Sequence, residues 1–310
     1  MGRFRISLLG LFAVALVLAG CMSSGTAFNP PGGTASTFKH MYLTNGSASL
    51  IYVYNLPITS TSTAAVTLSS PIAIPGMLFV DKTGRLFVGN FSTSKTLDVY
   101  NLPLTASSTP AFTLTTSQFQ PDAVTEDAAG NVYVADAVSG GYIDIYSGPV
   151  NSSVSPSSTI SNNAVGTYGL NSPFDLAFGP NGDLYVTSAS AIDQFAPPLS
   201  SGSLPNAEAT PNVDNFGLRT DSSSRVFVAN ASANGIINVY TQPVSSSSTP
   251  AFNLSVSATF LIGMAFDGSG NLWTVDHGGV LWEIKAPITS ASTAQQILTG
   301  TNGYGIAFGP

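Results

Sequence analysis

The chain has 310 residues, and its 16 acidic and 9 basic side chains give a formal net charge of −7 at pH 7. An acidic protein without basic clusters is not expected to bind nucleic acid or to be attracted electrostatically to anionic lipid. Hydrophobic residues make up 44% of the sequence and stand in alternating runs, so the chain can bury a core and is not expected to be disordered.

The N-terminus has the pattern of a targeting segment. Arg3 and Arg5 precede an apolar run over residues 6–18, which is shorter than the roughly 20 residues of a membrane-spanning helix. Residues 1–20 are therefore predicted to be a signal peptide. The motif Leu-Ala-Gly-Cys that ends at Cys21 resembles a bacterial lipobox, and this resemblance implies cleavage before Cys21 and lipidation of its thiol. The alternative is an ordinary signal peptide followed by an incidental cysteine.

Cys21 is the only cysteine, so a lipidated chain has no disulfide, no thiolate metal ligand and no thiol nucleophile. Residues 21–37 are predicted to be the lipidated cysteine and a flexible Ser-, Gly- and Pro-rich tether, with a reach on the order of 20–25 Å. We therefore expect a protein that acyl chains anchor to a bacterial cell-envelope membrane, facing the periplasm or the exterior. Loss of residues 1–20 removes two arginines, and the net charge becomes 7 − 16 = −9.

Residues 38–310 carry an internal repeat, seen most clearly as Asp-Ala-Ala-Gly-Asn-Val-Tyr-Val-Ala-Asp at residues 127–136. Asp and Gly three positions apart set a tight turn, and Val-Tyr-Val is a β-strand sequence. Related copies begin near residues 81, 179, 221 and 267, and a half copy begins at Met41. The residue that begins the strand after the turn recurs every 42 to 52 residues from copy to copy, and such a period is typical of propellers, solenoids or arrays.

Each period contains four strand-like pieces, and the repeats show no helical periodicity, so they are predicted to be four-stranded propeller blades. The copy at Met41 lacks its first strand, and the run at residues 303–310 is a first strand without its second. We therefore predict one all-β domain over residues 38–310. It is a six-bladed β-propeller in which the C-terminal strand completes the N-terminal blade and closes the ring.

The strand, Asp-x-x-Gly turn and strand pattern resembles NHL-type and SMP-30-like (TolB-like) six-bladed propellers over residues 38–310. The arginine that NHL repeats carry before the third strand is missing, and no Trp-Asp dipeptide marks the blades as in WD40 repeats. The resemblance to SMP-30-like enzymes implies a divalent cation held by acidic and Asn side chains where the inner strands begin. A resemblance to streptogramin lyases, which use His and Glu near the channel mouth, makes His277 the candidate histidine.

Aligned repeats give rings of equivalent positions. One ring, after the second strand, is polar in every blade, and its short side chains are predicted mainly to cap turns by local hydrogen bonds. Its members are Asn45, Asn90, Asp136, Ser188, Asn230 and Asp276. Two further rings, at the starts of the inner strands, are mostly apolar, with Asp122 and Asp175 as the polar exceptions.

Two uses of these inner-strand positions stay open. Asp122 and Asp175, with loop Asn or Asp residues, form a candidate Ca²⁺ site, since this cation takes six or more oxygen ligands. Phe174, Phe216 and Tyr304, which stand in the same two rings, instead form an apolar lip for a ligand or plug the channel.

Three more titratable residues are further candidates. Asp276 and His277 could be an acid–base pair, although adjacent strand residues point to opposite faces. Glu126 stands where other blades have Val or Phe, so burial would raise its pKa unless a partner pairs it. No Gly-x-Ser-x-Gly elbow, phosphate-binding loop or His-Glu-x-x-His motif is present.

The leading prediction is a lipid-anchored, extracytoplasmic propeller, expected to be a monomer, that binds a small molecule or an envelope protein without catalysis and without a cofactor. The runner-up is a metal-dependent lactonase-type hydrolase or a lyase, which requires Asp122, Asp175, Asp136, Asp276 and His277 to converge at one mouth. A third reading is a purely structural envelope protein with a plugged channel.

Overall fold

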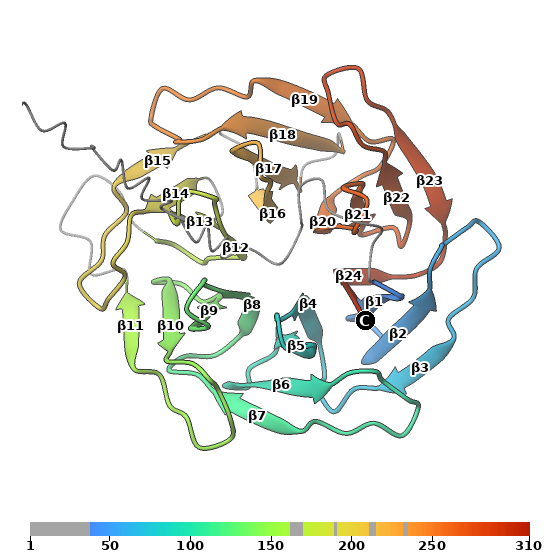
Figure 1. Cartoon of the computed structure of the whole chain (residues 1–310), viewed down its shortest axis with the longest axis horizontal. Coiled ribbons are helices and arrows are strands. Elements are labelled where there is room, and N and C mark those ends of the chain that lie inside the picture. The colour runs from blue at the N-terminus through green and yellow to red at the C-terminus, as the bar shows by residue number, and fades with distance from the viewer. Residues whose placement is uncertain (1–37, 162–169, 189–190, 211–214, 232–234) are drawn as a thin grey trace, which may run out of the picture.

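The computed structural model describes residues 38–161, 170–188, 191–210, 215–231 and 235–310. These residues form a ring of six four-stranded antiparallel sheets, the blades, which Figure 1 shows along the ring axis. The predicted six-bladed β-propeller is therefore confirmed. The predicted signal peptide, Cys21 and the tether lie outside the described residues. Within the described part of the chain, no helix is long and apolar enough to cross a membrane.

Five blades contain four strands that follow one another along the chain, and one blade joins the two ends of the described chain. In strand order the blades are β24 (Gly303–Gly309), β1 (His40–Asn45), β2 (Leu50–Asn55) and β3 (Val66–Ser69); β4 (Pro75–Val80), β5 (Arg85–Asn90), β6 (Thr96–Asn101) and β7 (Phe112–Thr115); β8 (Pro121–Glu126), β9 (Val132–Asp136), β10 (Tyr142–Tyr146) and β11 (Ser158–Ser161); β12 (Asp175–Phe178), β13 (Leu184–Thr187), β14 (Ile192–Phe195) and β15 (Ala207–Ala209); β16 (Asn215–Thr220), β17 (Arg225–Asn230), β18 (Ile236–Thr241) and β19 (Phe252–Ser255); β20 (Leu261–Phe266), β21 (Leu272–Asp276), β22 (Leu281–Ile284) and β23 (Ala294–Leu298).

Strands β24 and β1 close the ring. They pair antiparallel, with Met41 opposite Phe308, and the Lys39 N–H donates to the Gly309 carbonyl at 2.9 Å. The C-terminal strand thus completes the N-terminal blade, as the sequence predicts. Closure leaves the inner strand of this blade paired with β1 instead of presenting an open edge.

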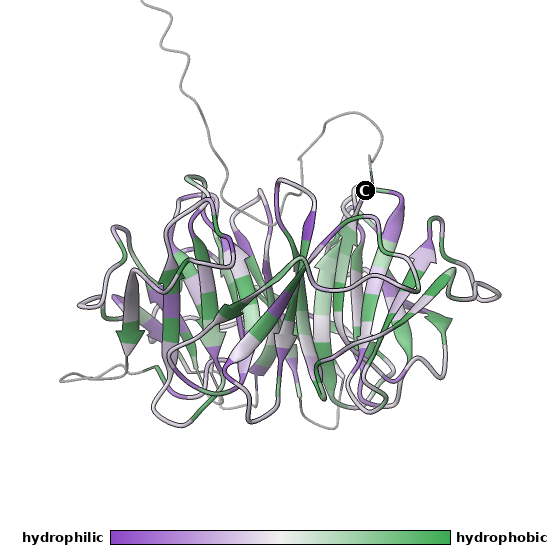
Figure 2. Ribbon diagram, turned by 90° about the horizontal axis from the view of Figure 1, so that it is seen from below, coloured by the Kyte–Doolittle hydropathy of each residue, from purple (hydrophilic) through white to green (hydrophobic). Residues whose placement is uncertain are grey.

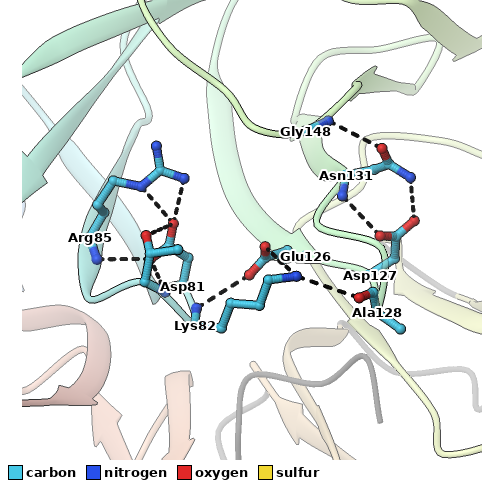
Figure 3. A network of polar contacts seen from close by, with 9 residues as sticks. Asp81, Lys82, Arg85, Glu126, Asp127, Ala128, Asn131 and Gly148 are labelled. Carbon is cyan, nitrogen blue, oxygen red and sulfur yellow. Dashed lines mark hydrogen bonds and ion pairs between the residues drawn. The ribbon is translucent and has the colours of Figure 1, made fainter. Parts of the chain in front are cut away.

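The Asp-x-x-Gly motifs form the turns that follow the inner strands. The Asp81 carboxylate accepts hydrogen bonds from the backbone N–H groups of Thr83 at 2.9 Å and Arg85 at 2.8 Å, and Gly84 has a φ of 80°. Asp127 holds Asn131 in the same way (Figure 3). We call this side of the ring the turn side, and the opposite side, where the inner strands begin, the start side. Figure 2 shows the strands running between the two.

The core lies between neighbouring blades. One apolar cluster, for example, joins Tyr42 and Ile51 of the first blade to Leu78, Leu86 and Tyr100 of the second. Each blade buries both faces against its neighbours, which explains why most strand positions are buried on both sides of the pleat.

Around the axis, the inner strands touch through glycine. A Cβ added to Gly217 would lie 2.3 Å from the carbonyl oxygen of Ile262. A Cβ added to Gly263 would lie 2.3 Å from the carbonyl oxygen of Tyr304. At Gly305 it would lie 2.6 Å from the Gly76 carbonyl oxygen. These distances leave no room for a side chain. Glycine at these positions therefore lets the backbones of neighbouring inner strands come into contact near the start side.

Candidate functional site in the central channel

Four side chains from four inner strands form two bonded pairs in the central channel. They are Asp122 of β8, Asp175 of β12, Arg219 of β16 and Tyr304 of β24, and we call them the channel cluster. The repeat places them there, because the innermost strands of all six blades surround the channel. The structure thus brings together two predicted acids and a predicted aromatic residue with an arginine that the sequence analysis did not single out.

Asp122 is fully buried, with no exposed surface. Its Oδ1 accepts a hydrogen bond from the Met77 N–H at 3.1 Å, and its Oδ2 accepts one from the Tyr304 hydroxyl at 3.3 Å. A Cβ on Gly76 would lie 2.0 Å from Oδ1, so the neighbouring inner strand makes room for the carboxyl group by having no side chain there. Burial raises the pKa of Asp122 to about 7, against the opposing effect of the Met77 N–H.

Asp175 is equally buried but has more partners. Its Oδ2 accepts hydrogen bonds from Arg219 Nη1 at 2.7 Å and from the Leu218 N–H at 2.8 Å, and its Oδ1 accepts one from the Leu176 N–H at 2.9 Å. Burial raises the pKa of Asp175, and the Arg219 guanidinium opposes that rise. Asp175 and Arg219 therefore form a buried ion pair in which both carboxylate oxygens are already hydrogen-bonded.

The two halves of the channel cluster are coupled electrostatically. The charge of Asp175 adds to the rise in the pKa of Asp122. Burial, and then the neighbouring Asp122 and Asp175 carboxylates, raise the pKa of Tyr304 well above its ordinary value. Asp122 can consequently exchange a proton near neutral pH, while the Tyr304 hydroxyl stays protonated and available as a donor.

Aromatic side chains gather near the starts of the inner strands. Phe174 and Phe216 stack with ring centroids 4.4 Å apart, and Phe216 contacts Phe260 at 5.6 Å. Tyr304 instead packs against Phe91 at 6.0 Å. The predicted aromatic group is thus brought together in part, with two further phenylalanines that the ring of equivalent positions did not include.

The channel cluster does not fit a hard cation well. Among the described residues, no three His, Cys, Asp or Glu side chains gather closely enough to hold a metal ion. Asp175 gives both oxygens to N–H donors and a guanidinium, which compete directly with a cation. The Ca²⁺ site on Asp122 and Asp175 stays a prediction.

Asp136, Asp276 and His277 have partners other than the channel cluster. Asp136 accepts the Gln118 N–H at 3.2 Å, and burial, followed by the neighbouring Asp144 carboxylate, raises its pKa to about 8. Asp276 accepts the Val280 N–H at 2.9 Å and the Trp282 indole N–H at 3.1 Å.

The capping role predicted for the polar ring matches the contacts of three of its members. Asn45, Asn90 and Asp276 each accept a backbone N–H from the turn that follows. His277 is exposed and lies edge-on to Phe260 at 5.7 Å. The described residues thus give it an aromatic neighbour and do not pair it with Asp276.

Glu126 has the partner that one of the two predicted alternatives requires. Its Oε1 lies 3.3 Å from Lys82 Nζ, and its Oε2 accepts the Lys82 N–H at 3.3 Å. Figure 3 shows this ion pair between neighbouring blades beside the Asp81 and Asp127 turns. Glu126 therefore ties two turns together on the turn side.

Arg219 is the functional candidate that sequence reasoning missed. Its ring of equivalent positions is mixed in character: Phe79, Thr125, Ala177, Arg219, Ala265 and Ala307. A single charged residue in an otherwise uncharged inner-strand ring is the signal that could have found it. Its pairing with Asp175 could not be read from the repeat, because the bulge between Asn215 and Leu218 shifts the local register.

Comparison with known proteins gives a likeness in structure alone. No family model matches the sequence, and no curated protein matches it. A protein of unknown function from Bacteroides caccae superimposes with a TM-score of 0.65 at 12% identity, covering 88% of this chain and 99% of the other.

Two further similar structures carry functional names. A periplasmic gluconolactonase of Pseudomonas aeruginosa has a TM-score of 0.63 at 14% identity, covering 87% of this chain and 99% of the other. A proposed 6-phosphogluconolactonase of Bacteroides fragilis has a TM-score of 0.59 at 10% identity, covering 90% and 100%. At such low sequence identity, these similarities show a shared β-propeller fold and nothing about a shared activity.

Proposed function

We propose that this protein is an extracytoplasmic lactone hydrolase whose reaction centre is the Asp122–Tyr304 pair. The observation that carries the proposal is a fully buried carboxyl group in the central channel with a pKa of about 7, hydrogen-bonded to a tyrosine hydroxyl at 3.3 Å. A base with a pKa near the working pH is what general-base catalysis requires. The similarity to a periplasmic gluconolactonase and to a proposed 6-phosphogluconolactonase supports the choice of reaction.

Tyr304 connects the buried base to the substrate. Asp122 is inaccessible, whereas Tyr304 is partly exposed. In the proposed step, a water molecule at the Tyr304 hydroxyl gives up a proton to that hydroxyl as Tyr304 passes its own proton to Asp122. In the same step the water oxygen bonds to the lactone carbonyl carbon, and the electron pair of the C=O π bond moves onto the carbonyl oxygen to give a tetrahedral oxyanion.

The second half of the reaction returns the proton. The oxyanion re-forms the C=O bond as the ring C–O bond breaks, and the proton held by Asp122 returns through Tyr304 to the departing ring oxygen. The product is the open-chain hydroxy acid, and both side chains recover their starting states. The raised pKa of Tyr304 keeps the tyrosinate from accumulating between the two steps.

Cellular location forms part of the proposal. The N-terminal pattern of charged residues, apolar run and lipobox-like motif supports export and anchoring through Cys21. The periplasmic location in the name of one similar structure agrees with an extracytoplasmic site.

The test is acid release from gluconolactone by the purified full-length chain, measured above the spontaneous rate. We expect Asp122→Asn to lower the catalysed rate on the order of 100-fold or more, the usual contribution of a general base. Tyr304→Phe, which keeps the ring that packs on Phe91, should cause a loss in the same direction. Asp267→Asn removes the same charge from a turn and should keep the rate. Equal rates for Asp122→Asn and the unchanged protein would refute the assignment.

A non-catalytic ligand-binding propeller is the second candidate. The observation that favours it is the complete burial of Asp122, with both oxygens engaged by Met77 and Tyr304. This alternative predicts no lactone hydrolysis above background, together with a ligand-dependent rise in the unfolding temperature.

A further inference from the structure

A pocket of about 480 Å³ opens on the turn side of the channel, opposite the aromatic group. The ends of β4, β16, β20 and β24 bound it, and Phe38 and Pro310 complete its rim. Neither Asp122 nor Tyr304 lines it, whereas Arg219 does. Its volume lies in the range of small-molecule sites, which is about 300–1,000 Å³.

The space of the pocket comes from alanine at three of the six equivalent positions of one inner-strand ring. At the ring position of Arg219, three blades have alanine, namely Ala177, Ala265 and Ala307, and all three line the pocket. Phe266 and Phe308 extend the apolar wall. A molecule in this space would contact hydrocarbon on most sides.

Arg219 is the polar anchor. Its side chain is 13% exposed, and its Nη1 donates to Asp175 and to the Leu218 carbonyl oxygen. Among the described residues, no acceptor bonds to Nε or Nη2, so those N–H groups are left for a ligand. A guanidinium in apolar surroundings recognises a planar carboxylate best, because its N–H groups match the two oxygens.

The charged groups around the pocket disfavour a ligand with more than one negative charge, and Asp81 in the lining is itself paired with Arg85. Asp175 already offsets the charge of Arg219, and Lys82 at the rim is paired with Glu126. The Asp175 carboxylate would repel a dianion such as a phosphate monoester, because Arg219 does not supply enough positive charge to neutralise both.

We propose that this pocket binds a small amphipathic monocarboxylate, with the carboxylate on Arg219 and the apolar body against the alanine and phenylalanine wall. The site is distinct from the Asp122–Tyr304 pair, and the proposal does not depend on lactone hydrolysis.

The test uses hexanoate as the probe and the full-length protein, with calorimetric titration and thermal unfolding as readouts. We expect hexanoate to bind and raise Tm, and hexan-1-ol, which has the same chain length without the carboxylate, to bind at least tenfold more weakly. Ala265→Leu or Ala307→Leu fills the pocket and leaves both partners of the Arg219–Asp175 ion pair in place. Each should weaken hexanoate binding at least tenfold. Ala251→Leu, at an exposed position in the outer part of a blade, is the control that should leave binding unchanged.

Arg219→Lys separates charge from geometry. The lysine keeps a cation for Asp175 but lacks the planar guanidinium group with its paired N–H donors. The affinity for hexanoate should therefore fall, while the affinity for hexan-1-ol should not change. If Arg219→Lys fails to fold, the two alanine variants still decide the question. Unaltered hexanoate affinity in Ala265→Leu and Ala307→Leu, or no binding by the unchanged protein, would overturn the proposal.

Discussion

At the scale of single residues, the surroundings decide what each aspartate does. Asp276 holds its own turn through Val280 and the Trp282 indole, and Asp175 is neutralised by Arg219. Asp122 has one backbone N–H and one hydroxyl donor, and no cation within the channel cluster bonds to it. The same residue type therefore serves as a cap, as half of an ion pair, and as the group whose protonation changes near neutral pH.

The raised pKa of Asp122 predicts how stability changes with pH. Its native pKa of about 7 lies above the roughly 3.9 of an aspartate in an unfolded chain. Between those values the folded protein holds more protons than the unfolded one, so the free energy of unfolding falls as pH rises from about 4 to about 7.

Asp122→Asn should remove this part of the pH dependence, which is at most on the order of 4 kcal/mol over the window. The measurement is urea unfolding of both proteins at pH 4, 5.5 and 7. Asp98, Asp136 and Asp193 also have raised pKa values, so a reduced slope is expected, not a flat profile. Parallel curves for the two proteins would show that Asp122 has no raised pKa.

The sequence could predict the acids of the site but not their partners. Asp122 and Asp175 stand out because their rings are otherwise apolar. The contact between Tyr304 and Asp122 joins residues 182 positions apart. Its existence depends on the side-chain directions after the bulges, which periodicity does not specify.

At the scale of elements, the inner strands depend on glycine where neighbouring blades touch. Gly263 of β20 faces the carbonyl oxygen of Tyr304 in β24, and no side chain fits between them. This contact also positions the strand that carries the proposed proton relay.

Gly263→Ala should therefore destabilise the fold by about 1–3 kcal/mol, the usual cost of overpacking, and should lower lactone hydrolysis by shifting Tyr304. Gly202→Ala is the matched control, because nothing lies within 4 Å of its added Cβ. Denaturant unfolding and the hydrolysis assay measure the two effects. Equal stabilities for both variants would mean that the inner strands are not in close contact.

Turns and strands were the most predictable elements. The Asp-x-x-Gly motif specifies a turn through local hydrogen bonds, such as those that the Thr83 and Arg85 N–H groups donate to the Asp81 carboxylate, and these need no tertiary information. The pocket on the turn side could not be predicted from the sequence. It is lined by three alanines that are distant in sequence, and no single one of them indicates a cavity.

At the scale of the whole molecule, the ring is closed by a single strand that is also part of the site. β24 pairs with β1 and carries Tyr304. Repeat counting predicted this closure because the first and last copies are complementary halves. Ring closure thus links the stability of the fold to the geometry of the channel cluster.

Removal of residues 303–310 should open the ring at β1. An uncovered apolar edge promotes association, so the shortened chain should elute as aggregates and lack a cooperative thermal transition. Adding the missing strand as a synthetic peptide should restore part of the monomeric fraction in gel filtration. A truncated chain that stays monomeric and unfolds cooperatively would show that β24 is dispensable.

The role of Asp122 as the general base is decided by the pH dependence of kcat/KM for gluconolactone hydrolysis. We predict that the rate rises with pH through an apparent pKa of about 7, because the ionised Asp122 carboxylate is the active form. In Asp122→Asn this rise should disappear along with most of the activity. An identical rise in the variant, or no catalysed hydrolysis at any pH, would contradict the account.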